Sequence, residues 1–174
     1  MINNFKYWFE QLAENANERK EKTPLENGQL PKWNNTTKNK EIKHKFTQEA
    51  NQLKGITARS SNNDEAGGEW LYDLIWREYD SNNFTGVKLA MEIELSDMKE
   101  RGLVYDFNKL LQSDAEYKVF VFQQKTINET KNLFAKFKLC VDNYNNKVES
   151  NFLLACWCWE TNTFIFKDFK EPVK

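Results

Sequence analysis

The chain has 174 residues, of which 29% are charged, and its formal net charge is −1 at neutral pH. This length suits one domain with a sizeable core, and the balanced charge gives no argument for a uniformly basic nucleic-acid-binding protein. No apolar run reaches the roughly 18 residues of a membrane span, and the N-terminus lacks the pattern of a secretory signal. We therefore expect a soluble, cytoplasmic protein that has no contact with a membrane.

The three cysteines give no sign of a disulfide framework or a zinc site. They are an odd number and lack the paired spacing of zinc ligands. Cys156 and Cys158 alternate within an apolar run, which is typical of a buried strand. Reduced thiols are the expected state of Cys140, Cys156 and Cys158 in an intracellular protein.

The first third of the chain is polar and is expected to hold two helices joined by a loop. Apolar residues at helical spacing from Phe5 to Leu12 predict an N-terminal helix. Segment 23–39, with two prolines and a glycine, is predicted as a loop. A thin apolar stripe predicts a second helix over about 40–53, which Gly55 would end, and segment 58–68 is again predicted as a loop.

From residue 69 onward the pattern changes to the alternation of strands. Segments 69–78 and 87–96 predict an antiparallel hairpin. The expected elements that follow are a helix capped by Asp97, a strand at 117–123, a helix capped by Thr126, and a hairpin of 151–160 with 163–169. This order predicts an α/β (α+β) fold in which helices cover both faces of a mixed sheet.

Three carboxylates lie inside otherwise apolar, strand-like runs: Asp73 in EWLYDLIW, and Glu92 and Glu94 in VKLAMEIELS. An ionised group in such surroundings is costly unless it is paired, hydrogen-bonded or bound to a cation. Alternation places Glu92 and Glu94 on one strand face, roughly 6.5–7 Å apart. Carboxylates at this spacing suit a hard divalent cation and the water that it activates.

These residues resemble the PD-(D/E)xK nuclease superfamily, which has the restriction-endonuclease-like fold. Its core is a helix, a hairpin bearing an Asp and a (D/E)-x-K pair, a crossover helix and a further strand. The resemblance covers roughly residues 41–124, with residue 160 as its furthest limit. Asp73 occupies the position of the first acid of the motif and Glu92 that of the second, whereas Glu94 occupies the position where the family usually has Lys. Some restriction enzymes of the superfamily also carry Glu-x-Glu at this point.

The resemblance implies a metal-dependent nuclease that acts on DNA, with Mg²⁺ or Mn²⁺ as cofactor. Asp73, Glu92 and the backbone carbonyl of Ile93 would hold the metal. Glu94 would orient or deprotonate the attacking water, and Lys109, in FNKLLQ on the crossover helix, would supply the migrated positive charge. The expected domains are an N-terminal helical and loop extension, 1–40, and a restriction-endonuclease-like domain, 41–174.

A second hypothesis keeps the fold without the catalysis. In this alternative, Glu92 and Glu94 are solvent-facing residues of an edge strand paired with Lys88, and Lys109 is an ordinary solvated lysine. The chain would then be a catalytically silent nuclease-fold module for nucleic-acid binding or protein interaction, with a homodimer through its aromatic strands as one form. The single histidine, His44, is expected on a solvated helix face.

Overall fold

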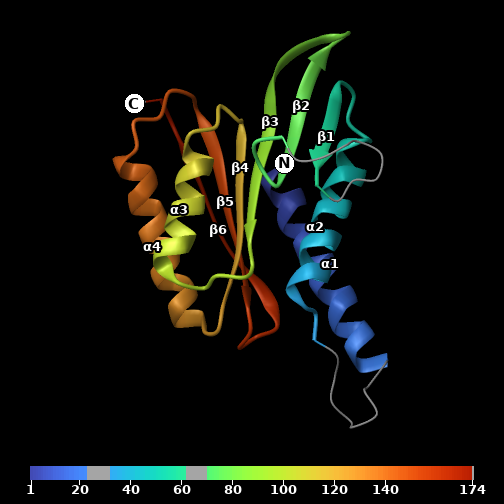
Figure 1. Cartoon of the computed structure of the whole chain (residues 1–174), viewed down its shortest axis with the longest axis vertical. Coiled ribbons are helices and arrows are strands. Elements are labelled where there is room, and N and C mark those ends of the chain that lie inside the picture. The colour runs from blue at the N-terminus through green and yellow to red at the C-terminus, as the bar shows by residue number, and fades with distance from the viewer. Residues whose placement is uncertain (23–31, 62–69, 174) are drawn as a thin grey trace.

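The structure, a computed structural model, describes residues 1–22, 32–61 and 70–173. Within these ranges the chain forms four helices and one sheet of six strands (Figure 1). In chain order the elements are α1 (Ile2–Lys22), α2 (Asn35–Ala50), β1 (Ile56–Ser60), β2 (Leu74–Asp80), β3 (Asn83–Glu94), α3 (Glu100–Leu111), β4 (Tyr117–Gln124), α4 (Ile127–Asn143), β5 (Ser150–Cys158) and β6 (Thr163–Glu171).

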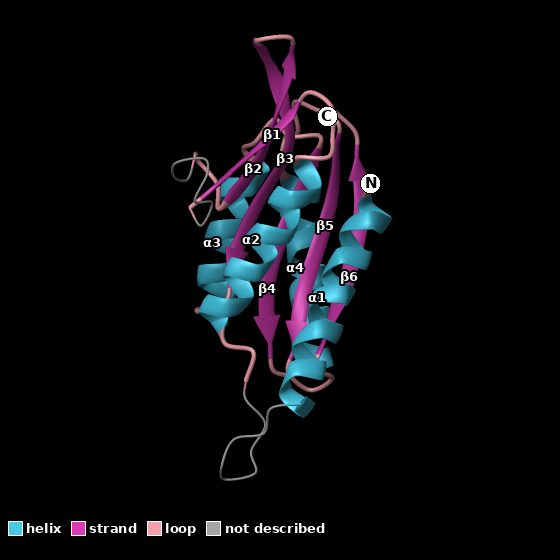
Figure 2. Cartoon of the chain, turned by 90° about the vertical axis from the view of Figure 1, so that its right-hand side faces the viewer, coloured by secondary structure: helices cyan, strands magenta, loops and turns pink. Residues whose placement is uncertain are grey.

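The six strands lie side by side in the order in which they occur in the chain. β1, β2 and β3 are antiparallel neighbours, β3, β4 and β5 run parallel, and β6 returns antiparallel to β5. Parallel neighbours need a crossover, and α3 and α4 provide the two crossovers. Both lie on one face of the sheet, while α1 and α2 cover the other (Figures 1 and 2). The expected mixed sheet with helices on both faces is confirmed.

One core lies between the sheet and the pair of helices α1 and α2. Phe5 of α1, Phe46 of α2 and Trp76 of β2 are fully buried there, and the Phe5 ring lies 5.4 Å from that of Phe46 and 5.7 Å from that of Trp76. Burying side chains of this size is a main source of folding free energy. The N-terminal helix α1 therefore packs directly on the sheet. The predicted domain boundary between residues 1–40 and 41–174 stays a prediction.

The second core lies between the opposite face of the sheet and helices α3 and α4. Phe107 of α3, Phe120 of β4 and Phe137 of α4 are fully buried, with the rings of Phe107 and Phe137 4.7 Å apart. Successive residues of a strand point to opposite faces, so Val119 and Val121 pack in the first core while Phe120 packs in the second. A strand buried on both faces reads as the continuous apolar run seen in β4.

Two elements differ from the sequence predictions in the first third of the chain. Helix α2 begins at Asn35, not near residue 40, because the Asn34 side chain accepts a hydrogen bond from the Thr37 amide and caps the helix. The composition predicts a loop over 58–68, but Ile56–Ser60 forms the edge strand β1. Residues 62–69 lie outside the described residues. The polar composition of β1, ITARS, concealed it.

The strands that carry the acids begin and end slightly away from their predicted limits. β2 begins at Leu74, so Asp73 directly precedes the strand, and β3 ends at Glu94. Helix α3 begins at Glu100 with Lys99 at the capping position; Asp97 instead accepts a hydrogen bond from the Lys99 amide. None of the described helices has the length and apolar character needed to cross a membrane.

Candidate functional site

Asp73 is held between a helix and the neighbouring strand. One carboxylate oxygen, Oδ2, accepts a hydrogen bond of 2.9 Å from the backbone N–H of Ile93, and the other, Oδ1, lies 2.9 Å from the Nζ of Lys43. The register pairs Leu74 with Met91, which brings Asp73 to the level of Glu92 on β3. Lys43 is 3% exposed and Asp73 22%, so water screens their attraction only weakly.

Glu92 is buried on the face of β3 that is covered by α3. It is 6% exposed, and the Nζ of Lys109 lies 3.6 Å from its carboxylate. The same Nζ is closer to Asp106, at 2.7 Å, so Lys109 compensates Glu92 only in part. Burial, and then the nearby charge of Asp73, raise the pKa of Glu92 to about 7. The negative charge of Asp73 therefore opposes the ionisation of Glu92.

Glu94 forms the turn that follows β3. Its Oε1 accepts hydrogen bonds from the backbone N–H groups of Ser96, at 2.6 Å, and Asp97, at 2.7 Å, and from the Ser96 hydroxyl at 2.6 Å. These bonds fix one oxygen of the carboxylate in place. Glu94 also lines a cavity of about 310 Å³ together with Ile93 and residues of α2. It thus borders a space that a ligand can enter.

Lys109 projects from α3 as an exposed side chain. A hydrogen bond to Asp106, the main cause, raises its pKa, and the charge of Glu92 acts in the same direction. The structure brings Lys109 to Glu92, whereas the lysine that meets Asp73 comes from the opposite face of the sheet. Sequence reasoning named Lys109 and missed Lys43.

A signal for Lys43 is present in the sequence of α2. Lys43 stands three, four and seven residues before the buried residues Phe46, Thr47 and Ala50. These spacings place all four on one side of a helix, so Lys43 interrupts the apolar stripe. A lysine in such a stripe is normally paired when it is buried, and the available partner is the acid at the start of β2. Read this way, the pattern would have indicated an ion pair.

The donor groups fit a divalent cation in kind. Two neighbouring carboxylates, one of them buried and with a raised pKa, form an electrostatic arrangement that a hard cation relieves. Ile93 lies beside both acids. In the described part of the chain, no group of three or more His, Cys, Asp or Glu side chains is spaced to hold a metal. Any metal here would thus need backbone or water oxygens beside Asp73 and Glu92.

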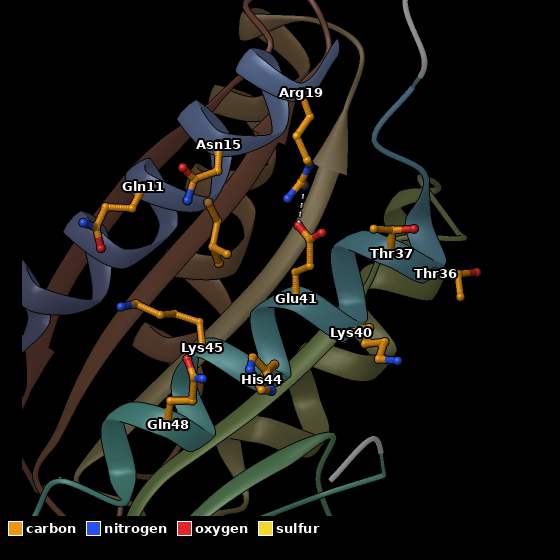
Figure 3. A pocket seen from close by; sticks show the side chains of 11 residues that line it. Gln11, Asn15, Arg19, Thr36, Thr37, Lys40, Glu41, His44, Lys45 and Gln48 are labelled. Atoms are coloured by element: carbon orange, nitrogen blue, oxygen red, sulfur yellow. Dashed lines mark hydrogen bonds and ion pairs between the residues drawn. The ribbon is translucent and has the colours of Figure 1, made fainter. Parts of the chain in front are cut away.

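A separate cavity of about 710 Å³ lies between α1 and α2 (Figure 3). Arg19 of α1 and Glu41 of α2 form an ion pair of 2.9 Å across it, and Lys40 and the exposed His44 lie along α2. None of the three acids Asp73, Glu92 and Glu94 lines this cavity. It is a polar groove away from the candidate chemistry, and His44 lies on an exposed helix face as expected.

Comparisons of the chain with protein-family models, with curated proteins and with solved structures find no match. Any function of this chain must therefore be inferred from the topology of its sheet and from the geometry around Asp73 and Glu92. A fold alone does not define an activity, so the function must be inferred from these side chains.

Proposed function

We propose that this chain is a metal-dependent nuclease domain that hydrolyses phosphodiester bonds in DNA and has the restriction-endonuclease-like fold. The proposal is supported by the order of elements from α2 to β4: a helix, three antiparallel strands, a crossover helix and a parallel strand. The single observation that carries it is the proximity of Asp73 and Glu92, where the start of β2 lies beside the end of β3. There, the charge of Asp73 contributes to the raised pKa of Glu92.

Each residue has a role that follows from its position. Asp73 and Glu92 would hold Mg²⁺ or Mn²⁺ with the backbone at Ile93. When bound, such a cation polarises the phosphate and lowers the pKa of its water. The fixed carboxylate of Glu94 has one oxygen tied to the turn, which leaves the other to orient a water or accept its proton.

Lys43 is our first choice for the positive charge that stabilises the transition state. It is buried and directly paired with Asp73, so its ammonium is already positioned beside the metal-binding acid. Lys109 is exposed, and Asp106 neutralises part of its charge. We assign Lys109 an auxiliary role.

One observation favours the second candidate, a catalytically silent module of the same fold. Both oxygens of Asp73 and one oxygen of Glu94 already have partners within the protein. A site that is satisfied in this way is stable without a metal. The second candidate predicts nucleic-acid or protein binding that is indifferent to Mg²⁺.

The test is the order of damage among matched variants. Asp73→Asn and Glu92→Gln remove a charge at nearly constant size, and the Asn side chain can still accept from the Ile93 amide, so both should abolish Mn²⁺-dependent cleavage of labelled DNA while the protein stays folded. Glu94→Gln should lose turnover but keep more metal affinity. Lys43→Met should be more damaging than Lys109→Met.

The control is Glu18→Gln, because Glu18 is an exposed acid of α1 that pairs with Lys22 at 3.1 Å. Its activity should match that of the wild type. If the wild-type protein cuts no DNA or RNA with Mg²⁺ or Mn²⁺, or if cleavage survives both Asp73→Asn and Glu92→Gln, the catalytic proposal is wrong and the binding module replaces it.

A further inference from the structure

A cavity of about 620 Å³ lies at the carboxyl ends of β4 and β5, beside the first turn of α2. Its walls include Trp159, Gln123 and Asn35, with Lys32 at the rim. In open α/β sheets, ligands bind outside the carboxyl ends of the strands, and this volume lies within the range of small-ligand sites. Nothing in the proposed catalytic chemistry uses these residues.

The indole of Trp159 is an exposed but fixed platform within this cavity. Trp159 is 40% exposed, and its ring N–H donates a hydrogen bond of 3.2 Å to Oε1 of Gln123. Gln123 is itself buried: Oε1 also accepts from the Nζ of Lys38 at 3.0 Å, and its amide nitrogen donates to Asn35 at 3.1 Å. A ring held by such a network loses little conformational freedom when a ligand stacks on it.

The charge around the platform suits an anionic ligand. The Nζ of Lys32, an exposed lysine, lies 5.8 Å from the centre of the Trp159 ring. The positive end of the α2 dipole points to the same region, and none of the described residues that line the cavity is acidic. An aromatic face, side-chain amides and positive charge are the combination that binds a nucleotide.

The cavity adjoins a smaller one that Glu94 lines. The smaller cavity lined by Ile93 and Glu94 shares Asn35, Thr36 and Ser96 with it. A polynucleotide whose phosphate lies near Glu94 would therefore lie close to the space beside Trp159.

We propose that this cavity is a subsite for an unpaired nucleobase of single-stranded nucleic acid, which stacks on Trp159 while an adjoining phosphate meets Lys32. Bases within a duplex do not offer a free face for such stacking, so the subsite should favour single strands. The position of the strand relative to Glu94 rests on the proposed function, but the stacking does not.

The experiment measures fluorescence anisotropy of labelled single-stranded DNA and RNA oligonucleotides, and of a DNA duplex, in EDTA so that no cleavage occurs. Trp159→Ala should weaken single-strand binding about tenfold to a hundredfold, as expected for the loss of one stacked base. Trp159→Phe should retain most of the affinity. Trp70→Ala is the matched control, because Trp70 is 38% exposed and lies just before β2, outside the cavity; its affinity should be that of the wild type.

Lys32→Glu tests the same subsite without touching the core, and it should weaken single-strand binding even if Trp159→Ala fails to fold. Unchanged affinity in Lys32→Glu and in a folded Trp159→Ala, or equal loss in Trp70→Ala, would overturn the proposal. So would a wild-type protein that binds duplex as well as single strands, or binds neither.

Cleavage with Mn²⁺, measured in parallel, separates the two proposals. Single-strand binding that depends on Trp159 in a protein that cuts nothing supports the subsite and removes the nuclease activity. Cleavage that depends on Asp73, with single-strand affinity indifferent to Trp159, supports the nuclease and removes the subsite.

Discussion

The ammonium nitrogen of Lys43 lies 2.9 Å from a carboxylate oxygen of Asp73, and this ion pair joins the middle of α2 to the residue that precedes β2. The lysine is almost completely buried. A charge withdrawn from water is tolerable only while its partner remains, so removing one member costs more than removing both. The pair therefore serves both the packing of α2 on the sheet and the placement of Asp73.

The first prediction concerns this pair. Lys43→Met and Asp73→Asn should each lower the free energy of unfolding by about 3 kcal/mol, the low end for buried pairs, because Asp73 keeps some contact with water. The double variant should be less destabilised than the sum of the two. Urea unfolding of the four proteins gives the coupling free energy as a double-mutant cycle.

Lys45→Met is the control for this cycle, since Lys45 and Glu49 form a partly exposed pair one helical turn apart. Such pairs contribute about 0.5 kcal/mol. Additive effects of Lys43→Met and Asp73→Asn would contradict the ion pair.

The second prediction concerns metal binding. If Asp73 and Glu92 take up a divalent cation, Mn²⁺ at a hundredfold over its Kd should stabilise the protein by about 2.7 kcal/mol. For a chain of this size that corresponds to a rise in Tm of roughly 5–10 °C in a thermal melt. The double variant Asp73→Asn, Glu92→Gln should show no rise. A wild-type melt unchanged by several millimolar Mn²⁺ would count strongly against a metal site.

The sequence predicts the centre of the fold better than its first third. Strands β3, β4 and β5 can be predicted from the sequence because large apolar residues occupy consecutive or alternate positions. The sequence predicts the start of α2 five residues late, since its first buried residue is Lys38, and Lys43 further along the helix also interrupts the apolar stripe. Their burial depends on partners at Gln123 and Asp73, which lie far away in the chain.

The same distinction holds for the candidate site. Alternation along β3 and the hairpin with β2 are local, and they sufficed to predict that Asp73 and Glu92 are neighbours. The contact of Asp73 with Lys43 depends on the packing of a helix against the sheet, and the contact of Trp159 with Gln123 joins the residue after β5 to β4. Neither leaves a periodic signal, because only the tertiary fold sets those distances.

The third prediction concerns Glu92 and acid pH. Burial and Asp73 raise the pKa of Glu92 from 4.5 to about 7, so between these values the folded protein binds more protons than the unfolded chain. The contribution of Glu92 to stability is therefore most favourable below about pH 4.5 and is lost as pH rises through 7. In Glu92→Gln this fall should disappear from urea-unfolding curves measured between pH 4.5 and 7. Asp106→Asn is the comparison variant, because Asp106 also pairs with Lys109, and it should keep most of this fall in stability.

The last prediction concerns Lys38, whose contribution to the pH dependence of stability has the opposite sign to that of Glu92. Burial, and then the charge of Lys20, lower the pKa of Lys38 from 10.5 to about 7. Between these values the unfolded chain binds more protons than the folded protein, so stability should rise as pH increases from 7 toward 10.5. The summed contribution of Glu92 and Lys38 to the free energy of unfolding therefore has its minimum near neutral pH.

Lys38→Met tests this account, because the substitution removes the buried ammonium at similar volume while Gln123 keeps its hydrogen bond from Trp159. The variant should be more stable than the wild type at pH 6, and the difference should shrink by pH 9, where the wild-type lysine is neutral. Lys118, whose pKa burial lowers to about 8, adds a rise of the same sign, so Lys118→Met serves as the parallel variant. If Lys38→Met retains the full rise between pH 7 and 10, Lys38 remains charged in the folded protein and the network around Gln123 must stabilise an ammonium ion.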